Sequence, residues 1–394
     1  MRVAYRNFLK SYEVNELTKL RNKIINANKI ILDLTNSNPS VQGLSPGLNQ
    51  FSNDFLENGD QYNPQPCGKV SAREAVAQYY VRRFDKNHSS EYGSRIILTS
   101  STSEAYTWLF KLLCERNDKV IIPQPGYPLC EDIVRLERLK ILNYYLLSNS
   151  GKWVVDRDSV MHGIATGAQV LVVINPHNPT GTYLSYNDLS WLGKVCAEYG
   201  LYLIIDEVFA DYAWNKSSLI SSLIYDQMPC LTFVLNGLSK TLALPHLKCS
   251  WILVFGSGKI VEEIISHLEF LGDTYLPVNS LVQNAIPNLL LQQEEIQKPI
   301  IDRLQINLSS MENVLPNWSN KHQACSGGWW VLYSLPKGVD DNEFSIELLR
   351  EKHTLVHPGY LFGLKEGYIA LSLITKAEFF TKGLKFIAEL INKF

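Results

Sequence analysis

The sequence predicts an α/β protein with two domains. Residues 48–275 are expected to form a large domain with a mostly parallel sheet flanked by helices, and residues 1–47 with 276–394 a smaller α+β domain. Two observations favour this division. Short β-branched runs alternate with helical stretches from residue 95 to 255, which is typical of βαβ units. The 394 residues are also enough to bury more than one core.

The strand candidates of the large domain are short apolar runs that end at polar residues or glycine. Runs of this kind, rich in valine, isoleucine and leucine, suit strands that are buried on both faces of a sheet. They lie at residues 95–99, 119–123, 140–145, 169–174, 201–205, 230–234 and 250–255.

Helical patterns precede and follow these strands. Residues 14–25 have helical periodicity, and a strand is expected at 29–34. Residues 71–83 predict a helix with Ser71 as its N-cap, since Glu74 follows three positions later.

The C-terminal part of the chain predicts the smaller domain. A long amphipathic helix is expected from Gly258 to about Glu269. Residues 329–335 and 367–373 are apolar runs of strand length, and they favour an antiparallel sheet accompanied by helices.

Composition excludes several classes of protein. The net charge of −2 and the absence of a basic run argue against a nucleic-acid partner. No apolar run approaches the roughly 18 residues of a membrane helix, and the N-terminus lacks a secretion signal. The seven cysteines include no CxxC pair, which argues against a zinc site or a disulfide framework. A soluble, cytoplasmic protein without a metal is expected.

Three polar clusters directly follow strand candidates. Asn178 lies in the turn 175–181, Asp206 ends the run 201–205, and Lys240 follows the run 230–234. The carboxyl ends of parallel strands meet where open α/β sheets bind ligands. A lysine that forms a Schiff base, an aspartate for a pyridinium nitrogen and an amide for a ring oxygen are the parts needed to hold pyridoxal phosphate.

Two further segments fit the same cofactor. A strand passes into a helix through three hydroxyl residues, and free N–H groups at a helix N-terminus bind phosphate. These residues are Ser101, Thr102 and Ser103. Tyr127 follows the strand 119–123, where its ring could stack on a flat cofactor.

These motifs resemble the class I/II aminotransferase family, the fold-type I pyridoxal-phosphate enzymes. The matching stretches extend from about residue 33 to 363. The specific ones are YNPQPCG at 62–68 followed by Arg73, NPHNPTG at 175–181, Asp206-Glu207, and Ser239-Lys240 followed by a basic residue at 248.

The resemblance implies a role for each candidate. Lys240 would hold the cofactor and move the substrate proton, while Asp206 would pair with the ring nitrogen. Asn178 would face the ring oxygen, Tyr127 would stack on the ring, and the hydroxyl residues 101–103 would hold the phosphate. Tyr62 would reach the phosphate of a neighbouring subunit, which implies a homodimer with shared sites.

Four positions depart from the family pattern. Phe209 replaces a tyrosine that donates to the ring oxygen, and Gly237 replaces a hydroxyl residue that contacts the phosphate. Lys248 stands where an arginine grips the phosphate, so the charge is kept and the bidentate fork is lost. Ala370 replaces the arginine that clamps the substrate α-carboxylate.

Because of Ala370, other groups are expected to hold the substrate. Candidate donors are the backbone near Ser37 and Asn38, the Asn178 amide and Lys365, while Trp329 and its neighbour Trp330 would favour a bulky apolar side chain.

The expected function is transfer of an amino group between an amino acid and a 2-oxo acid. A pyridoxal-phosphate-dependent lyase or decarboxylase is the alternative, since Ala370 removes a feature that transaminases generally need. A binding protein without activity is a third interpretation, and the set of Asn178, Asp206 and Lys240 argues against it.

Overall fold

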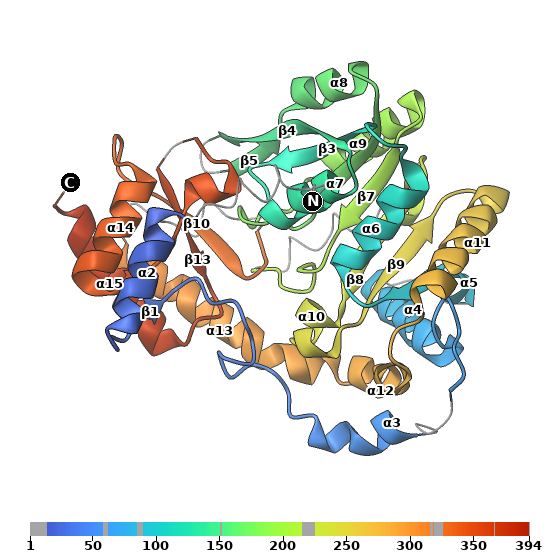
Figure 1. Cartoon of the computed structure of the whole chain (residues 1–394), viewed down its shortest axis with the longest axis horizontal. Coiled ribbons are helices and arrows are strands. Elements are labelled where there is room, and N and C mark those ends of the chain that lie inside the picture. The colour runs from blue at the N-terminus through green and yellow to red at the C-terminus, as the bar shows by residue number, and fades with distance from the viewer. Residues whose placement is uncertain are drawn as a thin grey trace, which may run out of the picture.

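A computed structural model describes residues 14–57, 62–84, 90–149, 152–214, 225–315, 318, 326–365 and 367–393. Its centre is an eight-stranded sheet, in which β8, β7, β6, β3 and β4 run parallel while β2, β9 and β5 pair antiparallel (Figure 1). In sheet order the strands are β2 (Ile96–Thr99), β9 (Ser250–Phe255), β8 (Thr232–Gly237), β7 (Tyr202–Asp206), β6 (Ala168–Ile174), β3 (Lys119–Gln124), β4 (Lys140–Asn149) and β5 (Lys152–Val155).

Helices cover both faces of this sheet, because successive residues of a buried strand point to opposite sides. Ile204 packs into the layer of one face, and Leu203 and Ile205 pack into the other. The first layer holds α6 (Thr102–Leu113), α7 (Pro128–Leu136) and α11 (Gly258–Tyr275). The second holds α4 (Val70–Phe84), α8 (Arg157–Ala165), α9 (Tyr186–Tyr199) and α12 (Ser280–Leu291).

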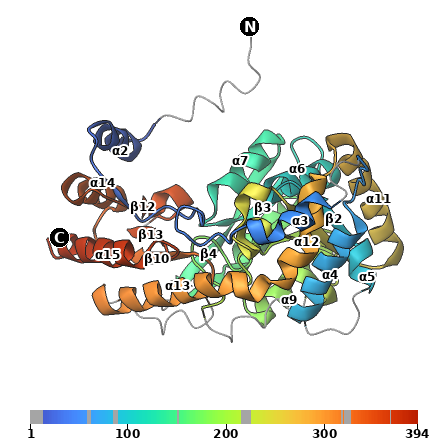
Figure 2. The ribbon, with the colours of Figure 1, turned by 90° about the horizontal axis from the view of Figure 1, so that it is seen from below.

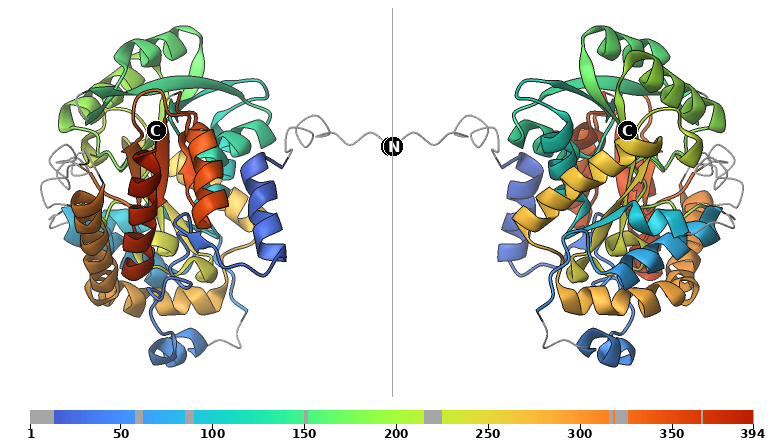
Figure 3. Two further views of the ribbon diagram at one scale, coloured as in Figure 1. Left: turned by 90° about the vertical axis from the view of Figure 1, so that its left-hand side faces the viewer. Right: turned by 90° about the vertical axis from the view of Figure 1, so that its right-hand side faces the viewer.

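A smaller antiparallel sheet has the order β10-β13-β12. Helices α14 and α15 lie together on its outer side (Figure 3, left). Its elements are β10 (Trp330–Ser334), β12 (His357–Pro358), β13 (Tyr368–Ser372), α14 (Asp341–Lys352) and α15 (Ala377–Ile391). The N-terminal segment joins this unit, since β1 (Leu32–Asp33) pairs in parallel with β11 (Thr354–Leu355) and α2 (Glu16–Asn26) packs on α14.

One long helix connects the two sheets. Figure 2 shows α13 (Gln293–Val314) running beneath both units, and it packs against α15 at the small sheet. The preceding α12 packs instead against α4 of the large unit. The domain limits at residues 47/48 and 275/276 stay a prediction.

Short elements complete the described chain: α3 (Ser52–Leu56), α5 (Ser90–Ser94), α10 (Leu238–Thr241), and the 3₁₀ turns Asn49–Phe51, Pro245–Leu247 and Gly359–Phe362.

The predicted fold class is confirmed: the sheet is mostly parallel, and terminal segments build the smaller sheets. All seven strand candidates of the large domain form strands. β5 was not expected, because its four residues pair only at the exposed end of β4. Among the described residues, no helix is long and apolar enough to cross a membrane.

One predicted helix start is wrong. α4 begins at Val70, so Ser71 lies inside the helix and is not its N-cap. The N–H of Lys69 donates instead to Gln283 Oε1 of α12, at 2.5 Å. A tertiary contact therefore satisfies the helix terminus where a local serine was expected to do so.

Candidate active site

The three polar clusters meet at one edge of the large sheet. Strands β6, β7 and β8 are parallel neighbours, and Ile174, Asp206 and Leu235 lie side by side in register. The segments that carry Asn178 and Lys240 therefore leave the sheet beside Asp206. The convergence expected from the sequence is confirmed by strand order and register.

Asp206 is the acidic group of this edge. The Tyr106 hydroxyl of α6 donates to its Oδ2 at 3.0 Å, and the Val208 N–H donates to Oδ1 at 3.2 Å. Burial raises the pKa of Asp206 to about 6, although both donors and the nearby Lys240 oppose this shift. A cation beside this carboxylate would stabilise its ionised form.

Lys240 is a half-buried amine among aromatic rings. Its Nζ lies 4.9 Å from the ring centre of Trp329 and 5.3 Å from that of Phe209. Burial lowers the pKa of Lys240 to about 8, against the attraction of Asp206. A larger share of neutral amine at physiological pH favours nucleophilic attack and proton transfer.

The backbone around Lys240 is held by a tyrosine that no sequence motif indicated. The Tyr212 hydroxyl donates to the Lys240 carbonyl at 2.7 Å and reaches the Thr241 carbonyl at 3.2 Å. Tyr212 also packs edge-on against Trp329, with ring centres 5.2 Å apart. The lysine backbone and the aromatic wall beside its amine are thus fixed by one side chain.

Asn178 and Tyr127 border the same space. The Asn178 Oδ1 atom is buried and has no hydrogen-bond partner within the described chain, which leaves this amide available to a ligand. Burial and then Asp206 raise the pKa of the Tyr127 phenol, so Tyr127 is electrostatically coupled to the carboxylate. Tyr127 is 46% exposed, so part of its side chain is accessible to a ligand.

The start of α6 offers polar groups beside Tyr106. Ser101 caps the helix by accepting the Glu104 N–H at 3.1 Å, and Thr102 and Ser103 form the first turn. First-turn N–H groups have no acceptor within a helix. Tyr106 follows Thr102 by four residues and Ser103 by three, a spacing that puts all three on one helix face. This spacing is the sequence signal that could have identified Tyr106.

Other candidate residues make no polar contact with Asp206 or Lys240 within the described chain. Tyr62 is 85% exposed, and Lys248 is exposed in a left-handed conformation (φ 51°). Ser37 is half-buried, and Asn38 uses its side chain to accept the Ser40 N–H at 3.0 Å. The segment that carries both nevertheless reaches the lysine turn, where Ser45 donates to the Ala243 carbonyl at 2.8 Å.

Close packing against β9 explains why position 237 is a glycine. A Cβ on Gly237 would lie 2.8 Å from the Cα of Ser250, its register partner on β9. The Ser250 side chain fills the space that a residue at 237 would need, and Ser250 is almost fully buried. A hydroxyl is thus present at this place from the neighbouring strand.

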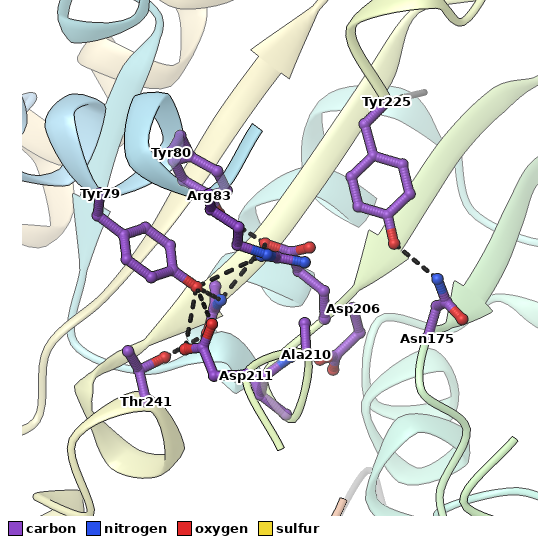
Figure 4. Close-up of polar contacts among 12 residues, drawn as sticks. Tyr79, Tyr80, Arg83, Asn175, Asp206, Ala210, Asp211, Tyr225 and Thr241 are labelled. Atoms are coloured by element: carbon purple, nitrogen blue, oxygen red, sulfur yellow. Dashed lines mark hydrogen bonds and ion pairs between the residues drawn. The ribbon is translucent and has the colours of Figure 1, made fainter. Parts of the chain in front are cut away.

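A buried polar network supports the edge from below (Figure 4). Arg83 of α4 pairs with Glu207 at 2.7 Å, and the Tyr79 hydroxyl lies 3.1 Å from both carboxylate oxygens of Asp211. Asn236, at the end of β8, reaches Tyr79 at 3.2 Å and accepts the Thr241 hydroxyl at 3.0 Å. The network therefore ties α4 to the turn that carries Lys240.

Similarity to known proteins agrees with this geometry. Residues 33–379 match the family described as aminotransferase class I and II. A tyrosine aminotransferase of Dictyostelium discoideum is 28% identical over 86% of this chain and 84% of its own length. An S-alkyl-thiohydroximate lyase of Arabidopsis thaliana is 25% identical over 86% of this chain and 75% of its own. The solved alanine aminotransferase of Pyrococcus furiosus has the same fold, with a TM-score of 0.85 at 18% identity over 100% of both chains. The chain therefore belongs to the aminotransferase class I and II family of pyridoxal-phosphate-dependent enzymes.

Proposed function

We propose that this enzyme transfers an amino group from an amino acid with a bulky apolar or aromatic side chain to a 2-oxo acid, in two half-reactions. The observation that carries the proposal is Lys240, an amine of lowered pKa beside Asp206 and against the rings of Trp329 and Phe209. Aromatic walls bind apolar side chains, and the relative named for tyrosine agrees with such a donor.

The residues fit pyridoxal phosphate. When bound, this cofactor withdraws electrons from the substrate carbon that loses its proton. Asp206 suits a protonated ring nitrogen, since burial leaves its carboxylate in need of a cation. The unpartnered Asn178 amide suits the ring oxygen, and part of the Tyr127 side chain is accessible. The phosphate would be held by Ser101, Thr102, Ser103 and Lys248.

Each side chain of the site would have a separate role in the reaction. Lys240 would hold the cofactor and would act as the base and acid that moves the substrate proton. Asp206 keeps the ring nitrogen charged, and Tyr106 orients Asp206. Phe209 and Trp329 exclude water from the amine, and Ser37 and Asn38 border the substrate.

A donor panel tests the reaction. We expect the kcat/KM for phenylalanine or leucine to exceed that for aspartate by at least about tenfold, the effect of one lost charge-assisted contact. High activity on aspartate without any gain for bulky donors would contradict the proposed substrate class.

A lyase reaction is the second candidate. It is favoured by Ala370, at the position of the expected carboxylate arginine, and by the relative that is named a lyase. The same panel separates the two reactions, because a transaminase forms more than one keto acid per site only when an oxo-acid acceptor is supplied. Turnover without an acceptor would favour the lyase.

We also propose a homodimer in which Tyr62 of each subunit completes the partner's site. The support is an aromatic side chain 85% exposed next to a motif typical of the family. Mixing Lys240→Ala with Tyr62→Phe subunits tests this: shared sites restore activity in the mixture, whereas independent sites give the sum of the two variants.

We also propose a cellular location and a domain division for this protein. A cytoplasmic location is supported by the free thiols of the described cysteines, Cys67, Cys114, Cys130, Cys196, Cys230 and Cys249. The division at residues 48–275 is supported by the apolar clusters: two cover the two faces of the large sheet, and a third is centred on the small sheet.

A further inference from the structure

Position 370 belongs to a short row of side chains across the small sheet. Ala370 on β13 lies directly opposite Leu332 on β10 and His357 on β12. Directly opposed residues of antiparallel strands share a face. This face packs toward the large sheet, since Trp153 of β5 joins the same apolar cluster and its ring centre lies 5.8 Å from that of Tyr368.

His357 is the polar member of that row. Its imidazole is half-buried, 5.6 Å from the ring centre of Trp330 and 6.0 Å from that of Phe362. Within the described chain, neither of its ring nitrogens has a hydrogen-bond partner, although both can donate or accept. An aromatic wall with one available imidazole matches a ligand that has an apolar body and an acidic end.

Two routes connect His357 to the catalytic edge. On one side, Trp330 follows Trp329, whose ring contacts the Lys240 amine. On the other, the Phe362 carbonyl accepts the Gly126 N–H at 2.9 Å, next to Tyr127. Phe362, against which His357 packs, therefore links the imidazole to the segment that carries Tyr127.

We propose that His357 receives the carboxylate of the amino-acid substrate, in place of the arginine that Ala370 replaces. The inference rests on the proposed function and names the group that would set its specificity. A protonated imidazole carries one charge and directs one of its two N–H groups at a carboxylate, whereas a guanidinium directs two parallel N–H donors at it. Leu332 and Ala370 carry no polar side-chain atom, so His357 is the member of this row that can bind a carboxylate.

The contact between His357 and a carboxylate depends on protonation of the imidazole. Burial lowers the pKa of His357, and the carboxylate of Asp33 on β1 opposes this shift. Without a ligand, the ring therefore stays neutral down to a lower pH than an ordinary histidine does. The other charged or titratable groups near this face are Tyr368 and Lys365, and Asp341 of α14 accepts the Tyr360 N–H at 2.8 Å, three residues from His357. A bound carboxylate favours the charged ring, hence binding takes up a proton and strengthens as pH falls.

The test is calorimetric binding of 3-phenylpropionate to the cofactor-loaded enzyme, at about pH 6 and about pH 8.5, either side of the usual histidine pKa. We expect His357→Gln to weaken binding roughly tenfold to hundredfold at the lower pH and to abolish its pH dependence. The uncharged 3-phenylpropan-1-ol should bind wild type and variant equally. His267→Gln, which removes an exposed imidazole of α11, is the matched control and should leave every value unchanged.

A second measurement does not depend on the folding of a variant. In wild type, the NMR titration of the His357 ring should move to higher pH when 3-phenylpropionate is added. Equal affinity of His357→Gln and wild type, or an unmoved titration, would overturn the assignment. If these results hold while no donor yields a keto acid, the proposed function fails and the carboxylate site stands. If donors react and His357→Gln matches wild type, only the site assignment fails.

Discussion

The two walls of the candidate site are built differently. On the large-domain side, Asp206 and Lys240 stand at strand ends above a buried network of hydrogen bonds and an Arg83–Glu207 ion pair. On the small-domain side, aromatic and aliphatic side chains surround a single imidazole, His357. The first wall is polar and fixed by contacts from several elements, and the second is apolar and sparsely hydrogen-bonded.

The polar wall therefore serves the cofactor chemistry, and the apolar wall serves the choice of substrate. The cofactor chemistry needs charged groups held at fixed places, which buried hydrogen bonds provide. Substrate choice needs a surface whose shape and charge fit one class of side chain, and apolar packing provides it. Ala370 belongs to the second wall, so a change at position 370 would alter that wall and leave the groups of the first in place.

The largest expected effect is loss of the amine on the polar wall. Lys240→Ala should lower kcat by roughly 10⁶-fold, the scale seen when a catalytic nucleophile is removed. The fold should persist, because the Lys240 backbone contact with Tyr212 does not need the side chain. Keto-acid formation and far-UV circular dichroism measure the two quantities. Retention of a tenth of the activity would remove Lys240 from its role.

The network beneath that wall should control stability. Arg83→Met leaves the buried carboxylates of Glu207 and Asp211 without their cation, and we expect a loss of about 3–5 kcal/mol in the free energy of unfolding. Urea denaturation gives this value. The double variant Arg83→Met/Glu207→Leu should recover part of it, whereas an equally severe double variant would show that the ion pair is not the cause.

Asp206 should destabilise the cofactor-free protein at neutral pH. Its folded pKa of about 6 exceeds the ordinary value, so its contribution to stability is full below the unfolded pKa and is lost as pH rises through about 6. Asp206→Asn is therefore expected to stabilise the cofactor-free form by about 1–3 kcal/mol near pH 7.5, at about 1.4 kcal/mol per pKa unit. Thermal unfolding at that pH and near pH 5 checks this, since the gain should shrink at the lower pH.

The smallest expected effect concerns Phe209, which lies between the two walls. Phe209→Tyr adds a hydroxyl beside the amine of Lys240, and a donor to the cofactor ring oxygen favours loss of the neighbouring proton. The pH midpoint of the visible absorbance should fall by up to about one unit in the loaded variant. An unchanged or raised midpoint would contradict this.

The sequence by itself determined the elements and the polar centre. Apolar runs that end at Asn, Asp and Lys clusters reveal both the strands and their reactive ends, because strand pattern and polar breaks are local properties. The positions of Asp206 and Lys240 at one edge follow from parallel strand order.

Only the tertiary structure decided how those groups are supported and what faces them. Tyr106, Tyr212 and Arg83 reach the centre from other elements, and no local pattern encodes such contacts. His357 joins Ala370 through strand register between segments 13 residues apart, although each segment alone is an ordinary apolar run. Register and long-range packing depend on the whole chain, so they become visible only when the sheets are assembled.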